Sequence, residues 1–286
     1  MPRTYEEYWI TNVDDLRLYV RDYGCADPRL TVLCLHGLTR NTADFEPLVG
    51  QLDPAYRVLV VDQRGRGKSD YDPKPERYNV INYVADTWTI LDHLDVAEVV
   101  VIGTSMGGLM AMLMTGMQPQ RIRGAVLNDV GPVVEPDGIA RIQAYVGKDP
   151  RVESWTDAVA LVRANNEHAF PDYEDAQWYT FARRMFIEDG DGLRLAYDPA
   201  ISQAISEDQT TAVPADLWPI FENMSNTPVL VVRGALSDIL SVQTVVEMGR
   251  RHPDLVSVDV PQRGHAPMLD EPEALRAIKD FLAARE

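Results

Sequence analysis

Continuous apolar runs alternate with helical patterns along most of this chain, and this alternation restricts the fold more than any other feature. The runs are mostly unbroken Val, Leu and Ile, which is typical of parallel strands covered by helices on both faces. Strands are predicted at Leu30–Leu35, Arg57–Val61, Glu98–Ile102, Ile122–Leu127, Pro228–Arg233 and Leu255–Val260. Helices are predicted at Asp44–Leu52, Val80–Leu94, Leu109–Met117, Val242–Arg251 and Pro272–Ala284. With a hairpin predicted at Tyr8–Val13 and Leu16–Tyr23, the pattern indicates an α/β fold with a doubly wound, mostly parallel sheet of about eight strands.

One interval breaks the alternation. Between Asn128 and Asn226 no strong strand pattern appears, and the residues form helical patterns rich in aromatic and charged side chains. This interval is too long to be a loop in a compact domain. We therefore predict a helical cap subdomain over residues 131–217, inserted into a core domain that residues 1–130 and 218–286 form together.

The segment Gly103-Thr104-Ser105-Met106-Gly107-Gly108 directly follows one predicted strand and precedes a helical stretch. A GxSxG turn in this setting is a nucleophile elbow, in which the glycines permit a sharp backbone turn that lifts the serine hydroxyl above the end of the sheet. The helix that begins behind the serine points free N–H groups at the place where negative charge develops during attack on a carbonyl. Ser105 is therefore the candidate nucleophile.

An acid and a histidine follow this serine along the chain, in the order Ser, Asp, His. Asp238 lies just past the strand Pro228–Arg233, and His265 lies just past the strand Leu255–Val260. The carboxyl ends of parallel strands share one edge of a sheet, which is where ligands bind in such folds. The spacing thus predicts that the three side chains meet at that edge.

Composition narrows the class of protein. The 286 residues are 45% apolar and can bury the core of one domain plus an insertion. The formal net charge of -17, without a long Lys/Arg cluster, argues against nucleic acid as a partner. No run of about 18 apolar residues and no signal-peptide pattern at the start is present, so we predict a cytoplasmic protein without membrane contact.

No metal or cofactor is predicted. The chain has no HExxH pattern, no paired Cys/His spacing and no dinucleotide glycine fingerprint. Its two cysteines, Cys25 and Cys34, are expected to be reduced and structural. The expected partner is a small-molecule substrate, and the sequence carries no signal for the oligomeric state.

Five motifs together resemble the α/β-hydrolase superfamily over nearly the whole chain. They are His36-Gly37-Leu38 after the third strand, Asp62–Ser69 (DQRGRGKS) after the fourth, the elbow at Ser105, Asp238, and Gly264-His265. Within the superfamily, the chain is similar to the capped serine hydrolases that include small-molecule esterases, enol-lactonases and ring-fission-product hydrolases. The resemblance implies an α/β-hydrolase fold whose helical cap lies over the active edge.

The resemblance also implies a Ser-His-Asp catalytic triad. His265 would be the base that a poorly nucleophilic serine hydroxyl needs at neutral pH, and Asp238 would fix its tautomer and stabilise the imidazolium. The backbone N–H groups of Leu38 and Met106 would form the oxyanion hole.

Asp129 is the alternative acid, because it also follows a strand and some members of the superfamily carry the acid there. We prefer Asp238, in the loop after the penultimate strand. The expectation is that Asp238→Asn lowers kcat by several orders of magnitude and that Asp129→Asn has a smaller effect.

Substrate contacts are expected from four further residues. His36 lies in the turn that shapes the oxyanion pocket, where an orienting or packing role is favoured for it, and Arg40 lies close enough to that pocket to meet a substrate carboxylate. Trp178 and Arg183 represent the aromatic and basic side chains of the cap. The motif Asp62–Ser69 does not match a phosphate loop, and we expect it to be structural.

The leading functional hypothesis is hydrolysis of a small carboxylic ester or lactone through an acyl-enzyme. The alternative is a carbon–carbon bond hydrolase acting on an acidic ring-fission product, which would need an arginine such as Arg40 to anchor a carboxylate. A third hypothesis is a non-catalytic ligand-binding protein on the same fold.

Overall fold

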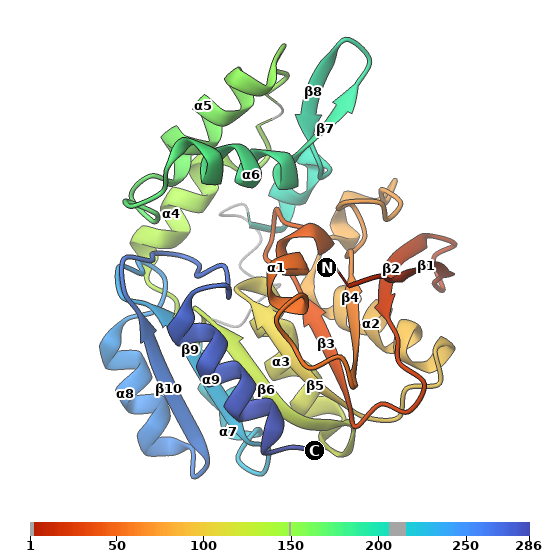
Figure 1. Ribbon diagram of the computed structural model, residues 1–286, viewed down its shortest axis with the longest axis vertical. Coiled ribbons are helices and arrows are strands. Elements are labelled where there is room, and N and C mark those ends of the chain that lie inside the picture. Colours follow the sequence, from red (N-terminus) through yellow and green to blue (C-terminus); the bar gives the residue numbers. More distant parts are fainter. Residues whose placement is uncertain (1–2, 149, 206–215) are drawn as a thin grey trace.

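The structure is a computed structural model that describes residues 3–148, 150–205 and 216–286. Its centre is an eight-stranded sheet with the order β1-β2-β4-β3-β5-β6-β9-β10 (Figure 1). The strands are β1 (Glu6–Thr11), β2 (Arg17–Tyr23), β3 (Leu30–Leu35), β4 (Tyr56–Val61), β5 (Val99–Thr104), β6 (Ile122–Asn128), β9 (Val229–Gly234) and β10 (Leu255–Val260). Strand β2 pairs antiparallel with β1 and β4, and every other pairing in this sheet is parallel, so the predicted fold class is confirmed.

Helices cover both faces of the sheet, which explains the unbroken apolar runs. In β5, Val99 and Val101 belong to one buried cluster, and Val100 and Ile102 belong to the other. The first cluster includes side chains of α2 (Val80–His93), α3 (Met106–Met117) and α8 (Val242–Arg251). The second includes side chains of α1 (Glu46–Val49) and α9 (Pro272–Ala283). Because successive strand residues point to opposite faces, a strand covered on both sides must be apolar at every position.

Short helices connect the longer elements. A 3₁₀ turn, η1 (Thr42–Phe45), precedes α1, so the helix predicted at Asp44–Leu52 is split in two and ends earlier than expected. The other short elements are η2 (Pro75–Arg77), η3 (Pro119–Arg121) and α7 (Trp218–Glu222). No helix in the described part of the chain is both long and apolar enough to cross a lipid bilayer.

An insertion follows β6 and lies beyond the carboxyl ends of the parallel strands (Figure 1). It contains α4 (Pro136–Tyr145), α5 (Trp155–Asn166), α6 (Asp175–Met185), a hairpin of β7 (Phe186–Asp189) and β8 (Gly192–Leu195), and η4 (Pro199–Ile205). The helical patterns are therefore present, but the expectation that this interval holds no strand was wrong. The two strands are only four residues long and mix charged with apolar side chains, so their alternation is too short to detect. Residues 149 and 206–215 of the predicted cap, 131–217, lie outside the described residues, and its boundaries stay a prediction.

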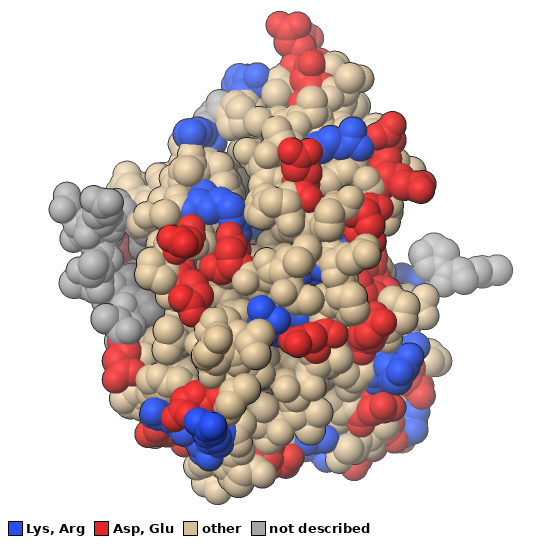
Figure 2. Space-filling view, turned by 90° about the vertical axis from the view of Figure 1, so that its left-hand side faces the viewer, with Lys and Arg blue, Asp and Glu red and all other residues tan. Residues whose placement is uncertain are grey.

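Charged side chains of both signs are present on the face that Figure 2 shows. On the face in Figure 2, basic side chains stand singly or in small groups among acidic ones. The acidic side chains on this face are thus spread out instead of being concentrated in one patch.

Candidate active site

Ser105 lies in a strained turn between β5 and α3, with φ 51° and ψ -114°. Positive φ is rare for a residue with a side chain and here aims the hydroxyl away from the strand direction. The glycines around Ser105 are required by close packing. A Cβ atom on Gly107 would overlap the backbone carbonyl of Leu35 in β3, and one on Gly103 would overlap the backbone of Gly107. The GxSxG pattern therefore lets the first turn of α3 lie directly against the sheet.

Ser105, His265 and Asp129 form a continuous hydrogen-bonded chain. The Nε2 atom of His265 is 2.8 Å from Oγ of Ser105, and its Nδ1 atom is 2.8 Å from Oδ2 of Asp129. Asp129 is fully buried. Its Oδ2 atom also accepts a 2.6 Å hydrogen bond from the Ser237 hydroxyl, and its Oδ1 atom accepts one of 2.8 Å from the Gly234 N–H. Three donors thus hold the carboxylate in one orientation beside the imidazole ring.

The prediction that Asp238 contacts His265 was wrong, because Asp238 is bonded to Arg141. Nε and Nη2 of Arg141, on α4, donate hydrogen bonds of 2.5 and 2.8 Å to the Asp238 carboxylate. The loop after β9 turns so that Ser237 faces Asp129 while its neighbour Asp238 faces α4. Partial burial opposes the charge of Asp238, but the hydrogen bonds and charge of Arg141 hold its pKa below the usual range. Asp129, the alternative in the sequence, occupies the position beside the histidine.

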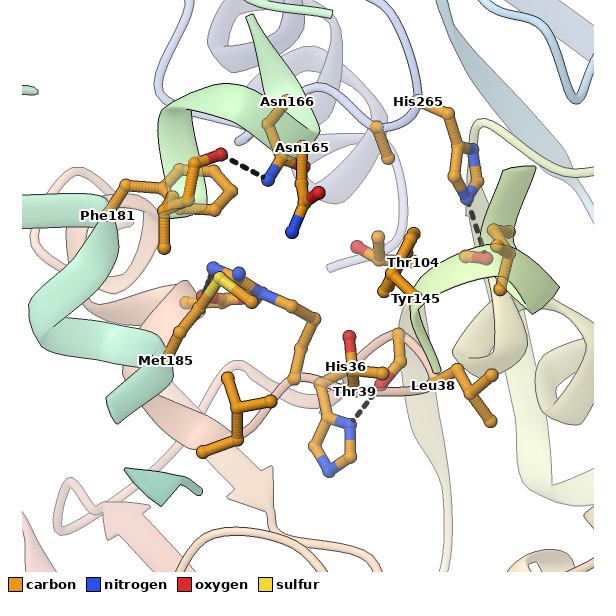
Figure 3. Close-up of a pocket in the computed structure, with 18 of the residues that line it drawn as sticks. His36, Leu38, Thr39, Thr104, Tyr145, Asn165, Asn166, Phe181, Met185 and His265 are labelled. Atoms are coloured by element: carbon orange, nitrogen blue, oxygen red, sulfur yellow. Dashed lines mark hydrogen bonds and ion pairs between the residues drawn. The ribbon is translucent and has the colours of Figure 1, made fainter. Parts of the chain in front are cut away.

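The turn after β3 is fixed by His36, which is buried. Its Nδ1 atom lies 2.7 Å from the Gly37 carbonyl (Figure 3). Its Nε2 atom accepts a 3.0 Å hydrogen bond from the Gln63 N–H. An imidazole in this setting is neutral, because burial lowers the pKa of His36 to about 4. Backbone groups occupy both ring nitrogens, so His36 orients the turn. Neither nitrogen is left to bind a substrate, which was the other role expected for His36.

The two expected oxyanion donors lie next to the elbow and this turn. The Gly37 carbonyl that His36 contacts belongs to the same peptide group as the Leu38 N–H. Met106 is the first residue of α3, so its N–H has no intrahelical acceptor. No turn or loop hydrogen bond in the described residues uses either N–H group. Both groups are therefore available to a bound oxygen atom.

A cavity of about 520 Å³ opens above these groups, between the sheet edge and the insertion. Thr39, Thr104 and His265 approach it from the core. Asn165 and Asn166 of α5 and Phe181 and Met185 of α6 approach it from the insertion, with the last two opposite His265 (Figure 3). The pocket thus combines a polar floor at Ser105 with mixed apolar and amide walls.

Arg40 lines this cavity, but its charge is already paired. Nε and Nη2 of its guanidinium donate hydrogen bonds of 2.6 and 2.5 Å to Asp44, and the group stacks on the ring of Phe181, with 4.3 Å to the centroid. The four-residue spacing of Arg40 and Asp44 is the sequence signal that could have revealed this pair.

Two residues that were predicted to contact the substrate, Trp178 and Arg183, do not line the cavity. Trp178 is buried in an aromatic cluster with Phe170, Tyr173 and Phe181 and does not line the cavity. Arg183 stacks on the ring of Trp155 and is about half exposed. Aromatic and basic residues at helical spacing here serve the packing and the surface of the insertion. Arg141 and Ser237, which sequence reasoning missed, carry no local motif that would have revealed them.

In the motif Asp62–Ser69, Asp62 and Arg64 have structural contacts. Arg64 is buried and bonded to three carboxylates, those of Asp14, Asp72 and Asp86. Asp62 accepts hydrogen bonds from the N–H groups of Thr42 and Lys68. These contacts fasten the loop after β4 to the turn that follows β3. Among the described residues, no group of three or more His, Cys, Asp or Glu side chains is arranged to hold a metal ion.

Comparison with known proteins identifies the class that this fold and site define. A family model described as the alpha/beta hydrolase fold matches residues 31–272. The chain belongs to the α/β-hydrolase family, and it is a hydrolase.

Its relatives include enzymes with named substrates. The chain is 36% identical to the 3-hydroxybutyrate-oligomer hydrolase of Cupriavidus necator over 263 residues, which cover 90% of this chain and 89% of that protein. It is 29% identical to the 2-(acetamidomethylene)succinate hydrolase of Mesorhizobium japonicum over 280 residues, which cover 96% and 94% of the two chains. Among solved structures, an α/β hydrolase from Novosphingobium aromaticivorans is 40% identical and superposes with a TM-score of 0.92 over 100% of both chains.

Proposed function

We propose that this protein is a serine hydrolase that cleaves a small carboxylic ester or lactone through an acyl-enzyme. The observation that carries the proposal is the hydrogen-bonded chain from Ser105 through His265 to Asp129 at the floor of the cavity. A serine hydroxyl becomes an effective nucleophile when an imidazole within hydrogen-bond reach accepts its proton.

In the proposed mechanism, Oγ of Ser105 attacks the ester carbonyl while its proton moves to Nε2 of His265. Asp129 keeps Nδ1 protonated and stabilises the imidazolium. The N–H groups of Leu38 and Met106 bind the oxyanion, and collapse of the tetrahedral intermediate expels the alcohol, which takes the proton from His265. A water molecule, deprotonated by His265, then hydrolyses the acyl-enzyme and releases the acid.

One relative supports an ester as the substrate. The Cupriavidus necator protein is named for the hydrolysis of 3-hydroxybutyrate oligomers, which are linear esters. The carbon–carbon alternative needs a free arginine as carboxylate anchor. Arg40 and Arg141 line the cavity but are bonded to Asp44 and Asp238, and Arg183 does not line it. We also propose that the insertion acts as a cap that selects substrates by size. A cytoplasmic location stays a prediction from the sequence.

The test compares kcat/KM for a neutral short-chain nitrophenyl ester with that for a 2-hydroxy-6-oxodienoate, with Ser105→Ala as the control. We expect the ester to be preferred and the alanine variant to lose at least about 10⁴-fold in kcat. A fluorophosphonate should label the wild-type protein at Ser105. Preference for the dienoate would replace the ester by the carbon–carbon alternative, and turnover by the alanine variant at the wild-type rate would refute the mechanism.

A further inference from the structure

Arg66 is a completely buried guanidinium group that lies behind the elbow and the turn after β3. Its hydrogen-bond acceptors are neutral. Nε donates to the Leu38 carbonyl at 2.9 Å, and Nη1 donates to the Arg64 carbonyl at 2.8 Å and to the Tyr83 hydroxyl at 2.9 Å. The guanidinium also faces the rings of Tyr83 and Tyr78, with 4.7 and 5.6 Å to the centroids. These contacts solvate the positive charge without neutralising it.

Arg66 differs from Arg64, two residues earlier, in that it has no carboxylate partner among the described residues. Arg64 is bonded to three carboxylates, whereas Arg66 forms no ion pair with any described residue. The nearby carboxylates of Asp14, Asp72 and Asp86 are engaged by Arg64, and Asp14 also by Arg77. A buried charge without a counterion costs free energy of folding. Such a cost is typical of sites where the charge acts on a reaction.

Arg66 contacts both residues that carry the proposed oxyanion donors. Its Nε atom is bonded to the carbonyl of Leu38, and its Nη2 atom lies 3.9 Å from Sδ of Met106. The buried positive charge therefore lies next to the two residues whose N–H groups are the proposed oxyanion donors, in a region that is closed to water. Arg66 does not line the cavity, so it has no direct access to a substrate.

We propose that Arg66 is a positioning residue whose buried positive charge stabilises the oxyanion of the tetrahedral intermediate through the Leu38 and Met106 donors. The inference rests on the proposed function, because only a reaction that develops negative charge at this point uses such a field. An opposite charge acts most strongly on a group that becomes charged in the transition state and little on a neutral ground-state carbonyl. The effect should therefore appear in kcat and leave KM nearly unchanged.

The experiment replaces Arg66 with Met, which keeps much of the length and removes the charge, and with Lys, which keeps the charge. With a neutral nitrophenyl ester, we expect Arg66→Met to lower kcat by about tenfold to a hundredfold with KM within about twofold. The inhibition constant of a boronic acid, which forms an anionic tetrahedral adduct on Ser105, should rise by the same factor. Arg66→Lys should recover most of both losses.

Arg121→Met is the matched control. Arg121 also stacks on an aromatic ring, that of Trp88, with 4.7 Å to the centroid, but it lies at the amino end of β6, away from the elbow. We expect this variant to leave kcat and boronic acid affinity unchanged. If Arg66→Met does not fold, the comparison of Arg66→Gln with Arg66→Lys carries the same test.

Two results would overturn the inference. One is an unchanged kcat in folded Arg66→Met, and the other is an equal loss in the Lys and Met (or Gln) variants, which would show that Arg66 only holds the loop. Fluorophosphonate labelling of Ser105 in the wild type separates the two proposals. Without labelling the proposed function itself fails, whereas labelling with an Arg66-independent kcat refutes only the role of Arg66.

Discussion

Asp129 shows how strongly the orientation of one side chain decides a site. It is buried at a positive φ of 56° directly after β6, and its two oxygens accept hydrogen bonds from His265, Ser237 and Gly234. Asp238 lies only one residue from Ser237, yet its carboxylate is bonded to Arg141 on α4. Of two adjacent residues in one loop, Ser237 thus holds Asp129 of the proposed triad, and Asp238 holds the insertion through Arg141.

The ranking of the two aspartate variants is therefore the reverse of the one expected from sequence. We expect Asp129→Asn to lower kcat by about 10⁴-fold, because the amide favours the wrong imidazole tautomer. Asp238→Asn should change kcat by less than about threefold, since it weakens a partly exposed ion pair worth about 1 kcal/mol or less. Steady-state kinetics of both variants checks this ranking, and a larger loss in Asp238→Asn would return the acid role to that residue.

At the scale of elements, the elbow depends on the contact between the start of α3 and the end of β3. Gly107 lies against the Leu35 carbonyl, and Gly108 lies against Val130 in the loop after β6. These glycines set the height of the helix above the sheet and with it the position of Ser105 relative to His265.

Gly107→Ala should disturb this arrangement. The added methyl group would overlap the backbone of Leu35, which cannot move without distorting the sheet. We therefore expect the free energy of unfolding to fall by about 1–3 kcal/mol and kcat to fall with it. Denaturant unfolding measures the first quantity. Gly249→Ala is the control, because Gly249 lies in α8 with no atom near the new methyl group, and alanine there should stabilise the helix by about 0.5–1 kcal/mol. A Gly107→Ala variant as stable and active as the wild type would show that the contact is not needed.

At the scale of the whole molecule, core and insertion build the cavity together. The core contributes the turn after β3, Ser105 and His265, and the insertion contributes α4, α5 and α6. The insertion is anchored beside the site by the ion pair of Arg141 with Asp238 and by the hydrogen bond from the Glu135 N–H to the Ile239 carbonyl. In the proposed mechanism the core carries the catalytic residues, and we infer that the insertion selects the substrate by its shape.

Ala164→Trp tests this division. Ala164 is an exposed residue of α5 that lines the cavity, so an indole there should occupy space meant for longer acyl groups. We expect kcat/KM for an octanoyl nitrophenyl ester to fall by at least about tenfold while that for the acetyl ester stays within about twofold. Equal effects on both esters would show that the insertion does not select by length.

The parts of the structure that follow from local patterns were predictable from the sequence. Strand burial on both faces requires unbroken Val, Leu and Ile, and the strand-turn-helix setting of Ser105 requires glycines at Gly103 and Gly107, so the fold class and the elbow could be recognised. His265 could be placed as well, because the carboxyl end of β10 leads to the same sheet edge. These features depend on the order of residues along a strand or turn, which the sequence specifies directly.

The partner of each polar side chain was decided only by the tertiary structure. Asp129 and Asp238 both follow strands that end at the active edge, and the direction of one loop assigns the first to His265 and the second to Arg141. Tertiary packing also decides that Trp178 is buried in the core of the insertion and that Arg66 is buried behind the elbow. A polar or aromatic residue takes its role from neighbours that are distant along the chain, and those contacts exist only once the core and the insertion have packed together.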